Sequence, residues 1–311
     1  MRYKVLVTCP PMLRGIDALR KSANEMSIAL TTPDVTQTLT EDELIDQLQG
    51  HDGWIIGDDP ATARVVAAAK RSGLKAAVKW GIGVDNVDFD AFKDAGISVI
   101  NTPNMFGDEV ADLAMCYLIG LARQAFLIDR EVREGLWPKP AGMSLRGRTV
   151  GIVGLGDIGS QFAVRAKASG LNILAWDPNV QHIAPGVKVM SEWPTGLLQC
   201  DFLVLACSLN SATMNLFDER IAHQIKAGLK VINVSRGPLI DEVFLLEALT
   251  SGLVASAALD VFECEPLPEG SLLRQFPSCI FGSHNASNTT DAVRKASLQA
   301  LGILSERFGA L

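Results

Sequence analysis

The sequence predicts an α/β fold with two Rossmann-like domains, each built on a parallel sheet. A chain of 311 residues is long enough for about two domains with full cores. Apolar runs typical of strands alternate with helical patterns, which predicts parallel strands joined by right-handed crossovers. One such unit carries the pattern G-x-G-x-x-G between a strand and a helix.

This glycine unit begins with an apolar strand, Val150 to Val153, and its helix, Ser160 to Ser169, is closed by Gly170. Gly154 allows a tight turn, Gly156 lets the backbone approach a pyrophosphate, and Gly159 lets helix and strand pack closely. The free N–H groups of the helix start favour a diphosphate. The cofactor residues expected here are Gly154, Gly156, Asp157, Ile158 and Gly159.

A second apolar strand, Asn172 to Trp176, ends in Asp177. This carboxylate would accept hydrogen bonds from the ribose hydroxyls and repel a 2′-phosphate, so the cofactor expected is NAD rather than NADP. The alternative is a glycine-rich turn in some other α/β protein. Such a turn would not require this order of strand, glycine fingerprint, helix, second strand and acidic residue.

The first hundred residues predict an α/β domain ahead of the glycine unit. Its expected strands are Val5 to Thr8, Asp52 to Gly57, Lys75 to Lys79 and Val99 to Asn101, and its expected helix is Ala61 to Arg71. The segment Gly81 to Asp88 places two glycines after a strand, where backbone N–H groups can hold a carboxylate. Asp88 is expected to cap a helix from Phe89 to Asp94. A turn that binds only its own chain remains the alternative.

Helical spacing predicts a helix from Asp108 to Arg123, whose apolar stripe indicates core or subunit contact (Val110, Leu113, Ala114, Tyr117, Leu118, Leu121). An irregular arm follows, from Gly135 to Arg148. The expected strands after it are Asp201 to Cys207, Lys230 to Val234, Ala255 to Asp260 and Ile280 to Phe281; the expected helices are Glu242 to Ser251 and Thr289 to Phe308.

Composition excludes several classes of protein. A net charge of -7 without a long basic run argues against nucleic acid or an anionic membrane as partner. No apolar stretch approaches the ~20 residues that span a bilayer, and the N-terminus opens into a strand without a signal peptide. The six cysteines form no C-x-x-C pair, so we expect reduced cytoplasmic thiols and no metal site.

Three ionisable residues follow predicted strands: Arg236, Glu265 and His284. The carboxyl ends of parallel strands lie at one edge of a sheet, where ligands bind. Taken singly, each residue has an ordinary alternative: a surface arginine, a turn acid before Pro266, and a loop histidine.

Their sequence context resembles the D-isomer-specific 2-hydroxyacid dehydrogenases, the family that includes phosphoglycerate, glycerate and D-lactate dehydrogenases. The resemblance covers nearly the whole chain in the right order. It is carried by the segments Gly81 to Asp88, Asn101-Thr102-Pro103, Gly154 to Gly159, Asn233-Val234-Ser235-Arg236-Gly237, Leu259 to Pro266, and by His284.

The resemblance implies an NAD-dependent enzyme that interconverts a small D-2-hydroxy acid and its 2-oxo acid. Arg236 would bind the substrate carboxylate and carbonyl, His284 would be the acid–base, and Glu265 would orient His284 and favour its protonated form. Ile82, Gly83 and Lys79 would bind substrate. Asp260 would lie near the nicotinamide, and the remaining cofactor contacts would come from Pro178, Ser208, Thr213, Val234 and Ala286.

The resemblance also implies a domain order. A flavodoxin-like substrate domain would span residues 1–101 and be completed by 286–311, with the NAD domain, 102–285, inserted between breaks near Thr102 and Asn285. Hinge motion would close the enzyme, and the helix after Asp108 would form a homodimer contact.

This chain departs from the family pattern at several positions. Ser283 replaces a proline before the histidine, Ala286-Ser287 replaces a glycine pair, and Ser208 replaces a proline in the adenine loop. Phosphoglycerate-type members carry an arginine where this chain has Gly57-Asp58-Asp59. The two carboxylates would repel a phosphate group, although Lys79 or Arg14 could bind it instead. The alternatives on this fold are an NAD-sensing corepressor-like binding protein and a formate- or phosphite-type dehydrogenase.

Overall fold

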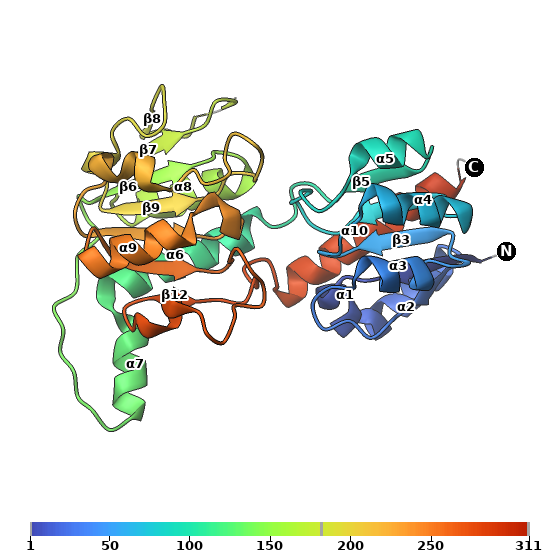
Figure 1. Ribbon diagram of the computed structural model, residues 1–311, viewed down its shortest axis with the longest axis horizontal. Coiled ribbons are helices and arrows are strands. Elements are labelled where there is room, and N and C mark those ends of the chain that lie inside the picture. The colour runs from blue at the N-terminus through green and yellow to red at the C-terminus, as the bar shows by residue number, and fades with distance from the viewer. Residues whose placement is uncertain (1, 181–182, 310–311) are drawn as a thin grey trace. The chain divides into compact units, whose positions relative to one another are not determined.

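The computed structural model describes residues 2–180 and 183–309. The chain forms two compact units: unit 1 is Met1–Phe106 with Asn288–Leu311, and unit 2 is Gly107–Ser287 (Figure 1). The divisions fall a few residues beyond the breaks expected near Thr102 and Asn285. At the first division the reason is packing, because Phe106 lies on Trp80 of unit 1 with ring centroids 5.1 Å apart.

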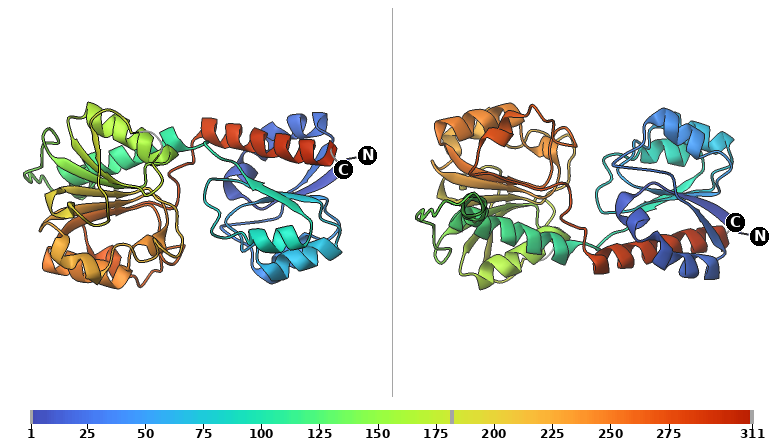
Figure 2. Two further views of the ribbon diagram at one scale, coloured as in Figure 1. Left: turned by 90° about the horizontal axis from the view of Figure 1, so that it is seen from above. Right: turned by 90° about the horizontal axis from the view of Figure 1, so that it is seen from below.

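Unit 1 contains a five-stranded parallel sheet in the order β2-β1-β3-β4-β5. This is the flavodoxin-like order 2-1-3-4-5. The strands are β1 Tyr3–Val7, β2 Ile28–Thr31, β3 Gly53–Ile56, β4 Ala76–Lys79 and β5 Ser98–Asn101. Helices cover both faces of the sheet (Figure 2): α1 Pro10–Arg14, α2 Ile16–Glu25, α3 Glu41–Gln47, α4 Ala63–Arg71, α5 Phe89–Asp94 and α10 Thr290–Gly309.

Several elements of unit 1 follow directly from local sequence. β3 and β4 are buried along their whole length, as expected of strands with both faces covered. Asp88 caps α5 by accepting the Ala91 N–H at 2.9 Å, as expected. In contrast, α1, α2, β2 and α3 were not predicted from the sequence. β2 lies at the sheet edge and buries only Ile28 completely, so its apolar pattern is weak.

Unit 2 contains a seven-stranded parallel sheet in the order β12-β11-β10-β9-β6-β7-β8. The strand order reverses between β6 and β9, which is the Rossmann arrangement and its ligand-binding switch point. The strands are β6 Thr149–Val153, β7 Asn172–Trp176, β8 Val187–Val189, β9 Phe202–Leu205, β10 Leu229–Asn233, β11 Val254–Leu259 and β12 Ile280–Phe281.

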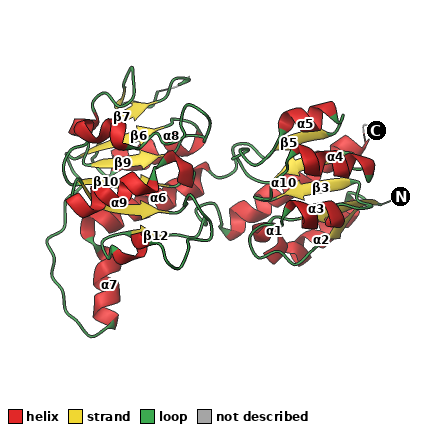
Figure 3. Cartoon of the chain, in the orientation of Figure 1, coloured by secondary structure: helices red, strands yellow, loops and turns green. Residues whose placement is uncertain are grey.

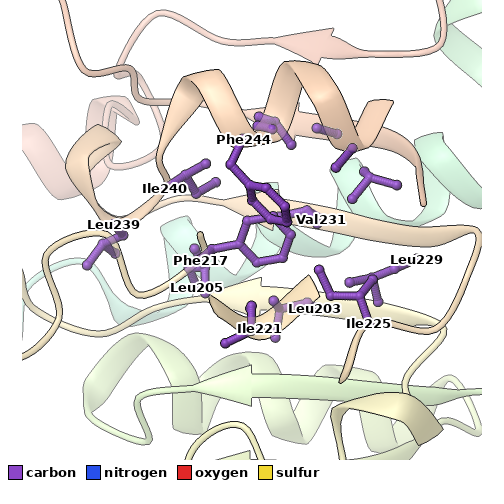
Figure 4. Close-up of a cluster of buried hydrophobic side chains, with 14 of the residues drawn as sticks. Leu203, Leu205, Phe217, Ile221, Ile225, Leu229, Val231, Leu239, Ile240 and Phe244 are labelled. Carbon is purple, nitrogen blue, oxygen red and sulfur yellow. The ribbon is translucent and has the colours of Figure 1, made fainter. Parts of the chain in front are cut away.

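Helices of unit 2 lie on both faces of this sheet (Figure 2). The α-helices are α6 Gly107–Arg123, α7 Ala125–Arg133, α8 Asp157–Ala168 and α9 Glu242–Ser251; short 3-10 turns are Leu197–Gln199, Glu219–Gln224, Gly237–Leu239 and Leu272–Gln275. Between α9 and the sheet, Phe217 and Phe244 pack with ring centroids 5.5 Å apart (Figure 4). Leucine and isoleucine side chains surround them, so this core holds β9 and β10 in place.

The expected apolar stripe of α6 is mostly core, with Leu113 half-buried. α7, which was not predicted, buries no residue completely and projects from unit 2 (Figure 1). The segment after it is irregular, as expected, and Figure 3 shows it as a long loop. Among the described residues, no single helix is long and apolar enough to cross a membrane. α6 and α7 together meet the length and composition, with a bend of 69° between them.

Candidate active site

The carboxyl ends of three neighbouring strands of unit 2 carry the candidate catalytic residues. Arg236 follows β10, Glu265 lies in the loop after β11, and His284 follows β12. These strands are adjacent and parallel, so the three residues belong to one edge of the sheet. The glycine loop after β6 opens at the same edge.

The His284 and Glu265 side chains form a hydrogen-bonded pair. His284 Nδ1 lies 2.8 Å from Glu265 Oε2, and the other carboxylate oxygen accepts the Phe262 N–H at 3.0 Å. The carboxylate therefore fixes the ring orientation and makes Nε2 the nitrogen on the opposite side of the ring. Both side chains are about three-quarters buried, at 24% and 23% exposed, so their interaction is only partly screened by water.

Asp260 holds the backbone that carries His284. Its carbonyl accepts the His284 N–H at 2.7 Å, and its Oδ2 accepts the Ala286 N–H at 2.8 Å. These bonds matter because His284 has a φ of 54°, a left-handed conformation that costs a non-glycine residue about 1–2 kcal/mol. The surrounding structure thus fixes a backbone geometry that the histidine would not adopt alone.

Asn233 performs the corresponding task for Arg236. It is completely buried at the end of β10; its Nδ2 donates to the Arg236 carbonyl at 2.8 Å and its Oδ1 accepts the Ser235 N–H at 3.1 Å. The Asp260 N–H also donates to the Asn233 carbonyl at 2.9 Å. The motif that contains Asn233 does not by itself predict this role; a polar residue at the end of a buried strand is the sequence signal for it.

The glycine loop has the close contacts and the open space that a bound pyrophosphate requires. Gly154 has a φ of +92°, and a Cβ there would lie 2.7 Å from the Cys207 Cα; a Cβ at Gly159 would overlap the Gly154 carbonyl oxygen. A Cβ at Gly156 would meet nothing within 4 Å. α8 begins at Asp157, and its N-cap, Gly156, offers no side-chain acceptor, so the first-turn N–H groups suit an anion.

Asp177 is fixed beside this loop. Its Oδ2 accepts the N–H of Leu155 in the glycine loop, and its Oδ1 accepts the N–H of Asn179, which follows Pro178; both distances are 2.7 Å. This position after β7 suits a carboxylate that binds ribose hydroxyls. In contrast, the Asp157 carboxylate packs against Gly107 at the start of α6, so its cofactor contact would be its backbone N–H.

The other expected cofactor residues of unit 2 follow the neighbouring strands. The Thr213 hydroxyl closes the turn after β9 by donating to the Ser208 carbonyl at 2.7 Å. Val234, after β10, and Ala286 are both buried. In the described part of the chain, no group of three or more His, Cys, Asp or Glu side chains is arranged to hold a metal ion.

The glycine loop of unit 1 follows β4. Asn86 fastens it by donating to the carbonyls of Gly57 and Asp59, at 3.1 and 2.6 Å. Asn101 Nδ2 donates to the Ile82 carbonyl at 3.1 Å. Within residues 2–180 and 183–309, the N–H groups of Ile82 and Gly83 donate to no other group, which leaves two adjacent donors for a ligand.

Lys79, Asp58 and Asp59 lie near this loop. Lys79 is 2% exposed; its Nζ lies 3.1 Å from both Asp58 Oδ1 and the Trp80 carbonyl oxygen. Asp59 is completely buried and accepts N–H groups of Leu39 and Gly57, at 2.9 and 3.2 Å. Burial raises the pKa of Asp59. Asp59 therefore stabilises the loop. Asp58 is the carboxylate of this pair that would repel a bound phosphate.

Comparison with known proteins decides the family. Residues 115–286 match the model of the D-isomer specific 2-hydroxyacid dehydrogenase, NAD binding domain. The chain belongs to this family. The matched model is that of an NAD binding domain, and the matched segment contains the glycine loop, α8 and Asp177.

Individual relatives extend the similarity over both units. The chain is 33% identical to a D-3-phosphoglycerate dehydrogenase of Archaeoglobus fulgidus over 93% of its length, but it spans only 54% of that protein. It is 32% identical to a hydroxypyruvate reductase of Thermotoga maritima, with 99% of both chains covered. The crystal structure of the TT0316 protein from Thermus thermophilus superposes with a TM-score of 0.87 at 29% identity, covering 99% of this chain and 97% of that one.

Proposed function

We propose that this dehydrogenase interconverts a small, unphosphorylated D-2-hydroxy acid and its 2-oxo acid, with His284 as general acid–base. The observation that supports this most strongly is the His284–Glu265 pair at the carboxyl edge of the NAD-binding sheet. A histidine oriented by a carboxylate is suited to exchange a proton through the opposite ring nitrogen.

We infer the roles from the residue types, from the family and from the strand ends that carry these residues. Bound NADH supplies a hydride for the carbonyl carbon of the 2-oxo acid. His284 gives its proton to the carbonyl oxygen, which completes the alcohol; in the reverse direction it takes that proton back. Arg236 binds the carboxylate and polarises the carbonyl through its planar guanidinium. Glu265 stabilises the protonated ring before the transfer.

Unit 2 is proposed as the NAD domain and unit 1 as the substrate domain. Ile82 and Gly83 in unit 1 have N–H groups that can bind the substrate carboxylate without a formal charge. Asp260, Val234 and Ala286 are proposed to bind the nicotinamide end of the cofactor, and Ser208 and Thr213 the adenine side.

The ion pair between Lys79 and Asp58 supports an unphosphorylated substrate. The Lys79 side chain is 3% exposed and its charge is balanced by Asp58, so little positive potential remains for a phosphate dianion. The full-length correspondence with the hydroxypyruvate reductase supports the same class. Hydroxypyruvate and glyoxylate are therefore the proposed 2-oxo acids.

A panel of 2-oxo acids tests this function. NADH oxidation should be measured with glyoxylate, hydroxypyruvate, pyruvate and phosphohydroxypyruvate, and kcat/KM compared. We expect hydroxypyruvate or glyoxylate to exceed phosphohydroxypyruvate by about tenfold or more, the effect of about 1.4 kcal/mol of repulsion. A preference for phosphohydroxypyruvate would refute the substrate class. Tight NADH binding without turnover of any acid would instead favour a binding protein.

We also propose a homodimer in a reducing compartment, such as the cytoplasm. α7 and the arm after it expose large apolar side chains, with Trp137 77% exposed, which is typical of a surface covered by a partner. All six cysteines are free thiols. Sedimentation equilibrium should give twice the mass of the chain; a monomer at micromolar concentration would contradict the dimer.

A further inference from the structure

A buried tyrosine contacts the acid that holds the His284 backbone. Tyr117 lies on α6 and is 5% exposed, and its hydroxyl donates to Asp260 Oδ1 at 3.2 Å. The other oxygen of that carboxylate accepts the Ala286 N–H at 2.8 Å. A phenylalanine would fill the same apolar space without a buried hydroxyl to satisfy, so the contact with Asp260 is what a tyrosine adds.

Gly282 provides the room for this contact. A Cβ at position 282 would overlap both Asp260 Oδ1 and the Tyr117 hydroxyl oxygen. The backbone conformation at position 282 does not require a glycine, because its φ lies outside the left-handed region. Its N–H donates to the Leu259 carbonyl at 2.8 Å and so continues the strand pairing. The missing side chain is therefore explained by the Tyr117–Asp260 contact.

The contact reaches the catalytic histidine in two steps. Tyr117 and the Ala286 N–H hold the two oxygens of Asp260, which is 1% exposed, and the Asp260 carbonyl holds the His284 N–H. Burial, followed by the negative charge of Asp260, raises the pKa of Tyr117 well above its ordinary value. The hydroxyl therefore stays protonated and remains a donor at any pH at which the enzyme would work.

We propose that Tyr117 is a positioning residue for the reaction: through Asp260 it sets the placement of His284 and of residue 286. This inference rests on the proposed function, in which His284 transfers the proton. Loss of the hydroxyl frees one oxygen of a buried carboxylate, and the left-handed backbone at His284 then has a less rigid support. The consequence is a slower chemical step with little change in the binding of the 2-oxo acid.

Tyr117→Phe tests the inference, and Tyr3→Phe is its matched control. Tyr3 and Tyr117 are the two tyrosines of the chain, and the Tyr3 hydroxyl also donates one bond of 3.2 Å, to the Phe308 carbonyl in unit 1. We expect kcat for the best 2-oxo acid to fall about tenfold in Tyr117→Phe, the effect of one hydrogen bond to a charged group. The KM for the 2-oxo acid should change less than about twofold. Tyr3→Phe should match the wild type.

A second variant keeps Tyr117 and disturbs the same contact. Gly282→Ala forces a methyl group toward the Tyr117 hydroxyl and Asp260, so kcat should fall while NADH still binds. An unchanged kcat in this variant would refute the inference, even if Tyr117→Phe failed to fold. Because both substitutions act on one contact, the double variant should lose less than the product of the two single losses. Independent losses would show that Tyr117 does not act through Asp260.

The outcomes separate this inference from the proposed function. If the wild type turns over 2-oxo acids and Tyr117→Phe has the same kcat, only the inference fails. If the wild type turns over none, the proposed function fails. The contact can then be measured without turnover, because Tyr3→Phe leaves Tyr117 as the single tyrosine. Its phenolate absorbance should appear only well above pH ~10, the usual phenol pKa. A titration near that value would refute the Tyr117–Asp260 bond.

Discussion

At the scale of single residues, buried polar groups hold the backbone segments that carry the candidate catalytic residues. Asp260 and Asn233 are almost completely buried, and their bonds hold the segments of His284 and Arg236. A buried acceptor without its donor costs about 1–3 kcal/mol, so each partner is fixed strongly. The same reasoning applies in unit 1, where the Lys79 ammonium is paired with Asp58.

The Lys79–Asp58 pair gives a prediction about substrate charge. Asp58→Asn leaves the Lys79 charge unbalanced, so the KM for phosphohydroxypyruvate should fall about fivefold, the effect of about 1 kcal/mol of added attraction. The KM for hydroxypyruvate should change less. Asp42→Asn, which removes an exposed carboxylate 2.5 Å from Arg64 in the same unit, is the control and should leave both values unchanged. An equal change in the two KM values would show that Asp58 does not select on phosphate.

At the scale of secondary structure elements, the opposite end of the unit 2 sheet is held by an ion cluster. Asp201, just before β9, lies 2.6 Å from the Lys226 ammonium and accepts the Thr149 N–H at the start of β6 at 3.0 Å. Burial alone would raise the pKa of Asp201, but the Lys226 hydrogen bond, the Thr149 N–H and nearby positive charge lower it overall. The ionised carboxylate therefore stabilises the folded sheet.

The direction of that pKa shift fixes the pH dependence. Because the folded-state pKa of Asp201 is below its unfolded value of about 3.9, its contribution is full above that pH and is lost as pH falls through the folded pKa. Asp201→Asn should lower the free energy of unfolding by about 2 kcal/mol at neutral pH. The difference from wild type should shrink under acid conditions. Denaturant unfolding at several pH values measures this. Asp129→Asn, on exposed α7, is the control; a pH-independent difference would contradict the account.

Strong local patterns allowed several elements to be predicted. The bounds of β7, α9 and β12 match the expected Asn172–Trp176, Glu242–Ser251 and Ile280–Phe281. α8 begins at Asp157 rather than Ser160 because the last residues of the glycine fingerprint form its first turn. α7 was not predicted; its large apolar side chains, among them Phe126 and Val132, are exposed rather than buried in the core of unit 2.

The candidate site was predictable in its residues but not in its supports. Arg236, Glu265 and His284 follow strands that the sequence marks clearly, and their proposed roles remain predictions. The Tyr117–Asp260 contact joins residues 143 positions apart, and Tyr117 has the spacing of an ordinary core residue on α6. Only the three-dimensional structure shows that Gly282 leaves space for its hydroxyl.

At the scale of the whole molecule, the chain combines a flavodoxin-like sheet with a Rossmann sheet. Unit 1 contains both ends of the chain, since α10 packs against β4 and α2. This organisation accounts for the family match and for similarity to relatives along both units. We propose that the family's reaction is carried out here with His284 as the proton donor.

The most direct test of that claim compares His284→Asn with His223→Asn, an exposed histidine of unit 2. NADH binding and NADH-dependent reduction of hydroxypyruvate and glyoxylate should be measured for both. We expect His284→Asn to bind NADH with unchanged affinity and to lose about 10²- to 10⁴-fold in kcat, the usual contribution of a general acid. His223→Asn should behave as wild type. A kcat for His284→Asn within a few fold of wild type would contradict the account.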